Sequence, residues 1–238
     1  MRHTGDPVRD MRVLAWASGF SEGQRCATLW LRLRWLLGGA VLGAALMLWS
    51  ATAWAQVPLQ AEQYRRDLTR IAISVWGLDA PVSLLAGQIE AESAWRPRAV
   101  SSAGARGLTQ FIDTTARDIA ARYIAGPPNP FDPRWAMQAQ SYYMRELLGQ
   151  VGPARNDTER MAFALSAYNG GLRRVRQRQA LSPDPARCLG LTCDLNPGIS
   201  VANQRENRTY PRRILLVLAP RYHAAGWGGA DIYSRLGA

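Results

Sequence analysis

The sequence predicts a mostly α-helical domain that follows an N-terminal export signal. Apolar residues recur every three or four positions in several segments, which is the spacing of one face of an α-helix. No convincing alternation of apolar and polar residues marks a β-strand, and no hairpin turn is evident. Pro, Gly, Asn and Asp collect between the periodic segments, as is typical of loops. With 238 residues, the chain is long enough for one domain and an extension.

The first 55 residues predict the export signal. Arginines precede an apolar stretch from Trp35 to Trp49, which leads to Ala-Trp-Ala at 53–55. This order of basic, apolar and small residues is typical of a signal peptide, here cleaved after Ala55. The apolar stretch is short for a membrane-spanning helix, which needs about 20 residues. We therefore expect export to the periplasm. Because the leader is long, an uncleaved segment that anchors the protein to the inner membrane is the alternative.

The helical segments that follow predict one compact domain over residues 56–230 and a short C-terminal tail at 231–238. In the first segment, Tyr64, Leu68 and Ile71 are spaced as on one helix face, with arginines between them. Segments with this pattern are 59–78, 135–151, 158–169 and 210–222. Loops are expected at 97–107, 126–134, 151–157 and 182–200.

The composition limits the kinds of function. The net charge is +11 and every basic residue is arginine, so an anionic partner is expected: nucleic acid, membrane or cell-wall polymer. An export signal and the absence of a nucleic-acid-binding motif argue against nucleic acid, and a membrane partner is expected only if the leader stays uncleaved. His223 is the only histidine after the leader, which excludes a Ser-His-Asp or Cys-His site and gives a zinc site little support. We predict no metal and no cofactor.

Two of the three cysteines, Cys188 and Cys193, lie close together in a proline-containing loop, and the third, Cys26, lies in the leader. In an oxidising compartment a local disulfide is expected, with two free thiols as the alternative. The basic run at 172–179 is expected to be a solvated helix face, with contact to acidic peptides or membrane phosphates as the alternative.

Two glutamates, Glu90 and Glu92, lie in a helix predicted between Pro81 and Pro97. Proline is well suited to the first turn of a helix, and it disfavours the α conformation of the residue before it, so the helix should end near residue 96. Residues two apart on a helix point about 200° away from each other. The two carboxylates therefore cannot both face one pocket.

Glu92 is the better candidate for chemistry. It shares the apolar face of the helix with Leu85 and Ile89, whereas Glu90 falls on a different face. An inward carboxylate loses hydration when charged, so its pKa should be raised, as a general acid near neutral pH requires. A structural ion pair with Arg106 is the alternative.

The loop after this helix, SSAGARGLTQF at 101–111, is rich in small and polar residues. Its two glycines allow the backbone to come close to a ligand, and Asp113 is a plausible N-cap of the next helix. A carboxylic acid followed by such a loop suits an extended sugar chain. A plain helix–loop–helix connection is the alternative, but it would not need so many glycines and serines.

Three motifs, ESAWRPRAVSSAGARGLTQF, ALSAYNGG and ENRTY, resemble the soluble lytic transglycosylase family in order and spacing. The resemblance covers about residues 60–222. It implies a lysozyme-like (goose-type), mostly helical domain that cleaves peptidoglycan, and it implies that Glu92 is the catalytic acid and base.

The resemblance also implies positions that bind the substrate. They are Ser101, Gln110, Tyr168, Asn169, Glu206 and Tyr210. Thr109 departs from the family pattern, where methionine is common, and should make one wall of the sugar site more polar. Asp113 replaces a common proline. The segment 172–205, with its cysteine pair, is not explained by the motifs.

The implied reaction breaks the β-1,4 bond between N-acetylmuramic acid and N-acetylglucosamine. Glu92 would protonate the leaving oxygen and then accept the proton of the C6 hydroxyl of muramic acid, which closes a 1,6-anhydro ring. A hydrolytic muramidase is the first alternative and needs a second carboxylate, from Asp113, Asp118 or Glu206. An inactive wall-binding component of a secretion or conjugation apparatus is the second. The expected partners are the glycan strands of peptidoglycan. The second alternative adds a secretion or conjugation apparatus as a partner.

Overall fold

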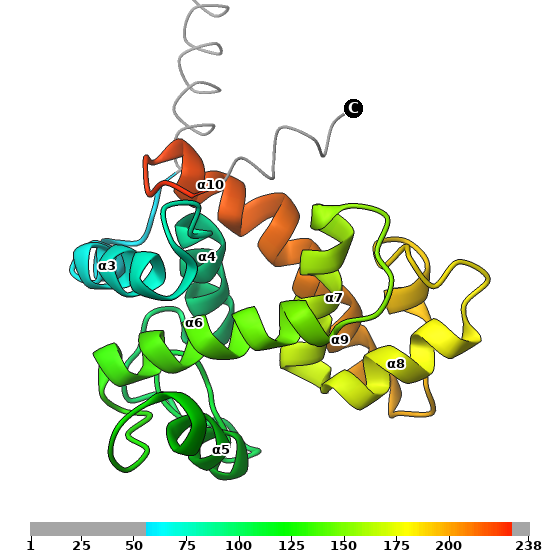
Figure 1. Ribbon diagram of the computed structural model, residues 1–238, viewed down its shortest axis with the longest axis horizontal. Helices are drawn as coiled ribbons and strands as arrows, with labels where there is room; N and C mark the ends of the chain where they lie inside the picture. The colour runs from blue at the N-terminus through cyan, green and yellow to red at the C-terminus, as the bar shows by residue number, and fades with distance from the viewer. Residues whose placement is uncertain (1–55, 230–238) are drawn as a thin grey trace, which may run out of the picture. The chain divides into compact units, whose positions relative to one another are not determined.

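The computed structural model describes residues 56–229. The predicted leader and the predicted tail at 231–238 lie outside the described residues. Within 56–229 the chain is helical and has no β-strand (Figure 1). The helices are α2 (Leu59–Glu62), α3 (Arg65–Trp76), α4 (Val82–Ser93), α5 (Asp113–Tyr123), α6 (Pro133–Gln150), α7 (Asp157–Gly170), α8 (Leu172–Leu181), α9 (Val201–Arg213) and α10 (Ala219–Ala224). A 3-10 turn at Thr192–Asp194 and a π-helical turn at Ile214–Leu218 complete the list.

Helix α4 lies in the middle of the hydrophobic core. Its side chains are buried along almost the whole helix, which packs against α3, α10 and the π-helical turn. Helix α6 runs across the domain and contacts α3, α5 and α7, while α7 contacts α8 and α9 (Figure 1). The glutamate-bearing helix is therefore held on several sides by elements that are far apart in the sequence.

The end of α4 is fixed by two residues in the left-handed conformation. The helix ends at Ser93, three residues before the expected position, because Ala94 and Trp95 have φ angles of 50° and 62°. Such angles are unfavourable for residues with a side chain. Trp95 is buried against other aromatic rings, and its indole N–H donates a hydrogen bond to Tyr222 Oη at 2.6 Å. This packing holds the strained turn directly after Glu92.

The expected N-cap at Asp113 is wrong. The residue that precedes α5 is Ile112, with no side-chain cap, and Asp113 is the first helical residue. Its carboxylate forms an ion pair with Arg106, at 3.0 Å. A carboxylate in the first turn still interacts favourably with the partial positive charge of the helix N-terminus.

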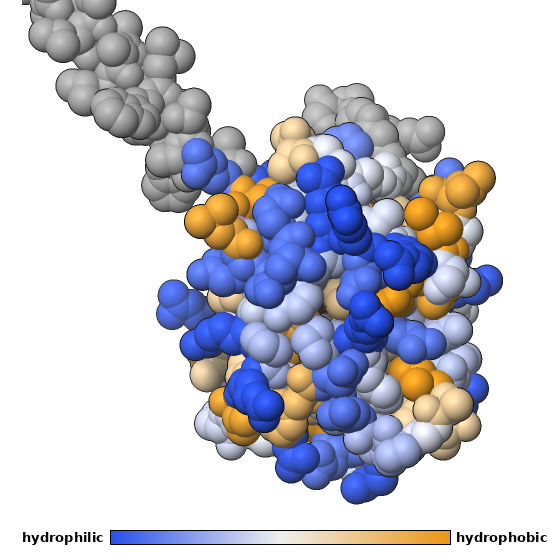
Figure 2. All heavy atoms as spheres, turned by 90° about the vertical axis from the view of Figure 1, so that its left-hand side faces the viewer, coloured by the Kyte–Doolittle hydropathy of each residue, from blue (hydrophilic) through white to orange (hydrophobic). Residues whose placement is uncertain are grey.

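None of the helices in residues 56–229 has the length and apolar character needed to cross a membrane. The exposed surface over α3 is rich in hydrophilic side chains (Figure 2). Among them are Arg65, Arg66 and Arg70 around a shallow depression.

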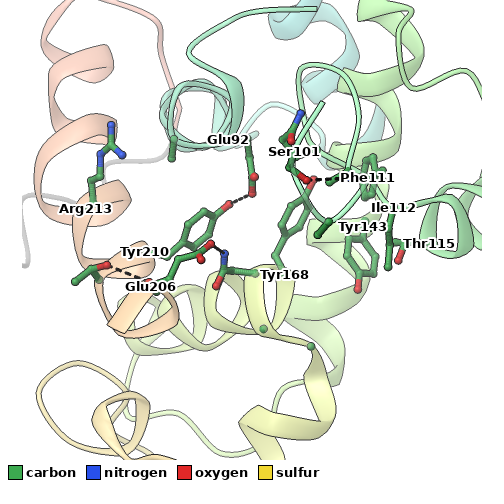
Figure 3. A pocket seen from close by; sticks show the side chains of 18 residues that line it. Glu92, Ser101, Phe111, Ile112, Thr115, Tyr143, Tyr168, Glu206, Tyr210 and Arg213 are labelled. Atoms are coloured by element: carbon green, nitrogen blue, oxygen red, sulfur yellow. Dashed lines mark hydrogen bonds between the residues drawn. The ribbon is translucent and has the colours of Figure 1, made fainter. Parts of the chain in front are cut away.

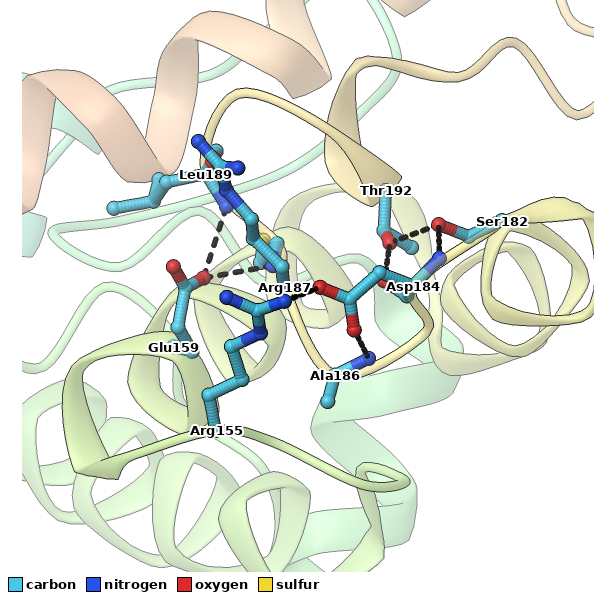
Figure 4. Close-up of polar contacts among 9 residues, drawn as sticks. Arg155, Glu159, Ser182, Asp184, Ala186, Arg187, Leu189 and Thr192 are labelled. Carbon is cyan, nitrogen blue, oxygen red and sulfur yellow. Dashed lines mark hydrogen bonds and ion pairs between the residues drawn. The ribbon is translucent and has the colours of Figure 1, made fainter.

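The segment between α8 and α9 forms an ordered, cross-linked loop (Figure 4). A disulfide joins Cys188 and Cys193. The Glu159 carboxylate, on α7, accepts hydrogen bonds from the backbone N–H groups of Cys188 and Leu189, at 2.7 and 2.9 Å. Arg155 and Asp184 form an ion pair beside it. These contacts attach the loop to α7 and to the segment that precedes α7.

Helix α8 carries the basic run, but it is not solvated throughout. Arg178 is fully buried. Its guanidinium donates to Asn207 Oδ1, to Gln204 Oε1 at 2.8 Å and to the Leu195 carbonyl at 2.9 Å. Arg178 therefore joins α8, the disulfide loop and α9, which carries part of the site described below.

In protein recovered from the exported fraction, Cys188 and Cys193 should resist alkylation until a reductant is added. The bond closes a short loop, with a sequence separation of 5 residues. Reduction should therefore lower the free energy of unfolding by only about 2 kcal/mol on the chain-entropy account. Alkylation with and without reductant, followed by mass spectrometry, measures the pairing. Two thiols that react in the native protein would contradict it.

Candidate active site

A cavity of about 600 Å³ opens between α4, α6, α7 and α9 (Figure 3). All seven residues that the sequence predicts for the site line it. They are Glu92, Ser101, Gln110, Tyr168, Asn169, Glu206 and Tyr210. They come from three motifs that are far apart in the sequence, and the fold brings them around one space.

Glu92 lies in the last turn of α4, with its carboxylate directed into the cavity (Figure 3). The Tyr210 hydroxyl donates a hydrogen bond to Glu92 Oε1. Burial raises the pKa of Glu92 to about 7, the Tyr210 hydrogen bond lowers it, and the charge of Glu206 raises it. The structural alternative, an ion pair between Glu92 and Arg106, is not formed, because Arg106 pairs with Asp113. Glu92 thus has the properties of a general acid at neutral pH.

Glu90 points away from the cavity. Its carboxylate forms an ion pair with Arg221 of α10 and accepts a hydrogen bond from the Tyr222 hydroxyl at 2.6 Å. Both side chains of the ion pair are largely buried, with 12% of Glu90 and 19% of Arg221 exposed. Glu90 therefore attaches α4 to α10, whereas Glu92 faces the cavity.

The loop that carries Ser101 and Gln110 is held by its own polar groups. Ser101 Oγ accepts a hydrogen bond from the Ala105 N–H at 3.0 Å. Gln110 has a φ angle of 51°, and its Nε2 donates to the carbonyls of Gly107 at 2.8 Å and Ala99 at 3.3 Å. The amide nitrogen of Gln110 is therefore used to shape the loop.

Tyr168 belongs to an aromatic wall of the cavity with Phe111 and Tyr143, whose ring centroids lie 5.3 to 5.8 Å apart. The Tyr168 hydroxyl donates to the Thr109 carbonyl at 2.8 Å. The expectation that Thr109 makes the sugar site more polar is wrong. Thr109 is fully buried, does not line the cavity and directs its hydroxyl to the Ala136 carbonyl at 3.4 Å.

Asn169 and Glu206, which both line the cavity, form a hydrogen-bonded pair. Asn169 Nδ2 donates to Glu206 Oε1 at 3.1 Å, and Asn207 Nδ2 donates to Asn169 Oδ1 at 2.9 Å. Because Arg178 binds Asn207, the chain of contacts runs from the buried arginine to the exposed Glu206. The segment 172–205 therefore supports the site through this chain.

The acidic residues that line the cavity, within residues 56–229, are Glu92 and Glu206. Asp113 and Asp118 do not line it, so only Glu206 is left as a second carboxylate among the three candidates. The same part of the chain contains no group of three or more His, Cys, Asp or Glu side chains that could hold a metal ion.

Sequence reasoning missed several residues of the cavity, among them Phe111, Tyr143 and Arg213. Two of them had a signal. Phe111 directly follows Gln110, and Arg213 lies three positions after Tyr210 on the same helix, where residues share a face. Tyr143 had none, because only the packing of α6 against α7 brings it to the cavity.

Comparison with known proteins agrees with the motifs. The family model described as "Transglycosylase SLT domain" matches residues 76–187. The chain is 34% identical over 109 residues to membrane-bound lytic murein transglycosylase F from Shewanella halifaxensis, covering 43% of this chain and 22% of that protein. It is 29% identical over 123 residues to the protein of the same name from Photobacterium profundum, covering 52% and 23%. The chain thus matches less than a quarter of the length of these relatives.

Solved structures give the same fold. An inactive mutant of lytic transglycosylase Slt from Pseudomonas aeruginosa matches with a TM-score of 0.51 and 23% identity, covering 71% of this chain and 25% of that one. A complex of the 70-kDa soluble lytic transglycosylase with bulgecin A matches with a TM-score of 0.50 and 26% identity, covering 69% and 25%. Residues 76–187 thus match a transglycosylase SLT domain, and the described part of the chain has a lysozyme-like helical fold that resembles those of the solved lytic transglycosylases.

Proposed function

We propose that this protein is a peptidoglycan lytic transglycosylase, which cleaves the β-1,4 bond between N-acetylmuramic acid and N-acetylglucosamine. The observation that carries the proposal is Glu92, a carboxylic acid directed into a cavity and given a pKa of about 7 by burial. At that pKa the group is protonated in a large fraction of molecules near neutral pH, and its conjugate base can still accept a proton. The names of the curated relatives support the same substrate.

In the proposed reaction Glu92 acts twice. It first donates its proton to the glycosidic oxygen as the bond to the anomeric carbon breaks, which releases N-acetylglucosamine with a free hydroxyl. The Glu92 carboxylate then accepts the proton of the C6 hydroxyl of muramic acid, whose oxygen bonds to the anomeric carbon. The proton returns to Glu92, and no water is consumed. The attacking hydroxyl is held in the same sugar, which gives it a large effective concentration over bulk water.

The groups around Glu92 have distinct tasks in this reaction. Tyr210 donates to Glu92 Oε1 and so stabilises the carboxylate that forms after the first proton transfer. Ser101 Oγ accepts from the Ala105 N–H, which leaves its own hydrogen for donation to a ligand carbonyl such as an N-acetyl group. The aromatic wall around Tyr168 offers an apolar surface against which a sugar ring can pack.

A hydrolytic muramidase is the second candidate, because Glu206 also lines the cavity. In such an enzyme the second carboxylate would activate a water molecule. Glu206 is exposed and its Oε1 accepts the Asn169 hydrogen bond. We therefore assign Glu206 the role of a positioning residue, which holds the Asn169 side chain. An inactive wall-binding component would not need a buried acid in a cavity, so Glu92 argues against that alternative.

Product analysis tests the proposal. Digestion of purified sacculi should yield mainly 1,6-anhydro-muramyl ends, about 18 mass units lighter than reducing ends because no water is added. Mass spectrometry of the released muropeptides measures the ratio, and sacculi free of other hydrolases are required. Predominantly reducing ends that disappear in Glu206→Gln would favour the muramidase instead.

We further propose that the catalytic domain spans residues 56–230 and acts in the periplasm after export. The predicted leader supports a location in the cell envelope, and so do the names of the relatives, which describe them as membrane-bound. The glycan strands of peptidoglycan would be the main partner. The site is consistent with turnover of the cell wall and with local opening of the wall for a secretion or conjugation apparatus.

A further inference from the structure

A row of buried amide side chains lies behind Tyr210. Gln88 of α4 and Gln140 of α6 are both fully buried. Gln140 Nε2 donates to the Leu85 carbonyl at 3.1 Å and to Gln88 Oε1 at 2.9 Å. Gln88 Nε2 donates to Tyr210 Oη at 3.3 Å, and Tyr210 donates to Glu92 Oε1. Neither glutamine lines the cavity, and neither belongs to the motifs of the family resemblance.

The direction of this row is determined by one backbone group. A carbonyl oxygen can only accept hydrogen bonds, so Leu85 requires the nitrogen of the Gln140 amide to face it. The second N–H of that nitrogen meets Gln88, which must therefore present its oxygen to Gln140. The Gln88 nitrogen is then the atom that faces Tyr210. A reversed Gln140 amide would place its oxygen against two acceptors, the Leu85 carbonyl and Gln88 Oε1.

The row has consequences for the proton on Tyr210. Because Gln88 donates to the Tyr210 oxygen, the Tyr210 hydrogen is free to point at Glu92. A hydroxyl that accepts a hydrogen bond also becomes a better donor. At the other end of the row, Gln140 Oε1 has no hydrogen-bond partner among the described residues.

We propose that Gln88 and Gln140 are positioning residues that direct the Tyr210 hydroxyl proton to Glu92 Oε1, so that the acidic proton of Glu92 is carried by Oε2. The inference rests on the proposed role of Glu92 as the acid. In the protonated state Oε1 is occupied by the Tyr210 hydrogen, and Oε2 is the oxygen left to hold the proton for transfer. In the ionised state the Tyr210 hydrogen bond stabilises the carboxylate.

The variants Gln88→Leu and Gln140→Leu test this assignment. Without Gln88 the Tyr210 oxygen loses its donor. Without Gln140 the Gln88 amide can reverse and accept the Tyr210 proton in competition with Glu92. In both variants the Tyr210 hydrogen bond to Glu92 weakens, and the pKa of Glu92 rises. The alkaline limb of the pH–rate profile should move upward by about half a unit to one unit, the size expected for one weakened hydrogen bond.

A carboxyl NMR titration gives a second readout that does not depend on activity. In protein labelled with 13C at the glutamate carboxyl groups, the signal missing from Glu92→Gln identifies Glu92. Its midpoint should move upward in both leucine variants by the same amount as the kinetic limb. If a leucine variant does not fold, Gln88→Met, with an unbranched side chain of similar size, replaces it.

Gln179→Leu is the matched control. Gln179 is also buried and donates to two backbone carbonyls, those of Pro153 at 3.3 Å and Pro185 at 3.1 Å, but it does not contact Tyr210. It should lower the melting temperature and leave the titration of Glu92 in place. Folded Gln88 and Gln140 variants with an unchanged midpoint would overturn the assignment. Activity that survives in Glu92→Gln would instead overturn the proposed function, and the NMR midpoint would still decide on the glutamines.

Discussion

Replacing Glu92 with glutamine should reduce the release of muropeptides from purified peptidoglycan by about 10³-fold or more, the range of a lost general acid and base. Glutamine has nearly the same shape and can still accept the Tyr210 hydrogen bond, so only the transferable proton is lost. Loss of turbidity and quantified muropeptides measure the effect. Circular dichroism should show an unchanged helical content, because the substitution leaves the packing of α4 intact.

Glu90→Gln is the matched control, two positions away on the same helix. It should retain most of the activity, because the Glu90 side chain faces α10 and not the cavity. It should not be neutral for stability. Arg221 would lose its partner in a largely buried position, at a cost of about 1 to 3 kcal/mol. An inactive Glu90 variant together with an active Glu92 variant would contradict the assignment of the two carboxylates.

Glu92→Gln should also change how stability depends on pH. The pKa of Glu92 is about 7 in the folded protein, above its ordinary value of 4.5. The folded state therefore holds a proton that the unfolded state has lost between these two values, and stability falls as pH rises through this window. The glutamine variant lacks this loss, so it should unfold at a higher temperature than the wild type at pH 8 and at a similar temperature at pH 4. Melting curves at the two pH values measure the difference, which is at most about 3 kcal/mol.

Replacing Gly107 with alanine should disrupt the loop that carries Ser101 and Gln110. Gly107 has a φ angle of 76°, and an added Cβ would lie 1.7 Å from the Pro130 carbonyl oxygen. Both atoms belong to the backbone or are fixed to it, so no side chain can move to relieve the clash. We expect a loss of about 3 kcal/mol or more in the free energy of unfolding, the range of severe overpacking. Since Gln110 Nε2 donates to the Gly107 carbonyl, activity should fall as well.

Gly104→Ala separates the clash from the cost of the backbone conformation. Gly104 lies in the same loop and has a φ angle of 80°, but an added Cβ would meet no atom within 4 Å. Only the left-handed conformation is penalised, at about 1 to 2 kcal/mol, and most of the activity should remain. Urea unfolding and muropeptide release measure both variants. Equal losses in the two would mean that the approach of the loop to Pro130 does not matter.

Much of the site could be predicted because its signals are local in the sequence. Helical phase separates Glu92 from Glu90, since residues two apart on a helix face in nearly opposite directions. The apolar face that contains Leu85 and Ile89 indicates that Glu92 points inward. Motif order predicts six further site residues, and the structure brings all of them to one cavity.

Other assignments failed because they depended on the path of the chain between elements. Aspartate is a common N-cap residue, but the turn before α5 places Asp113 one position inside the helix. Thr109 lies near the end of the loop motif, directly before Gln110 with its left-handed φ angle of 51°, and its side chain is buried in the core and does not line the cavity. A single positive φ angle changes which side chains face a ligand, and the periodicity of apolar residues in the sequence does not reveal such an angle.

The helical class, the inward direction of Glu92 and the choice of the residues around it follow from the sequence alone, because helical periodicity and short motifs encode local geometry. The hydrogen-bond and ion-pair partners of these carboxylates follow only from the packing of the helices: Tyr210 for Glu92, Arg221 for Glu90 and Asn169 for Glu206. The same packing also decided the direction of the row from Gln140 to Tyr210. Hydrogen bonds depend on distances of a few ångströms between groups that are far apart in the sequence, such as Gln88 and Tyr210, which are 122 residues apart. Such distances are determined by how the helices pack, and the spacing of residues along the chain does not contain them.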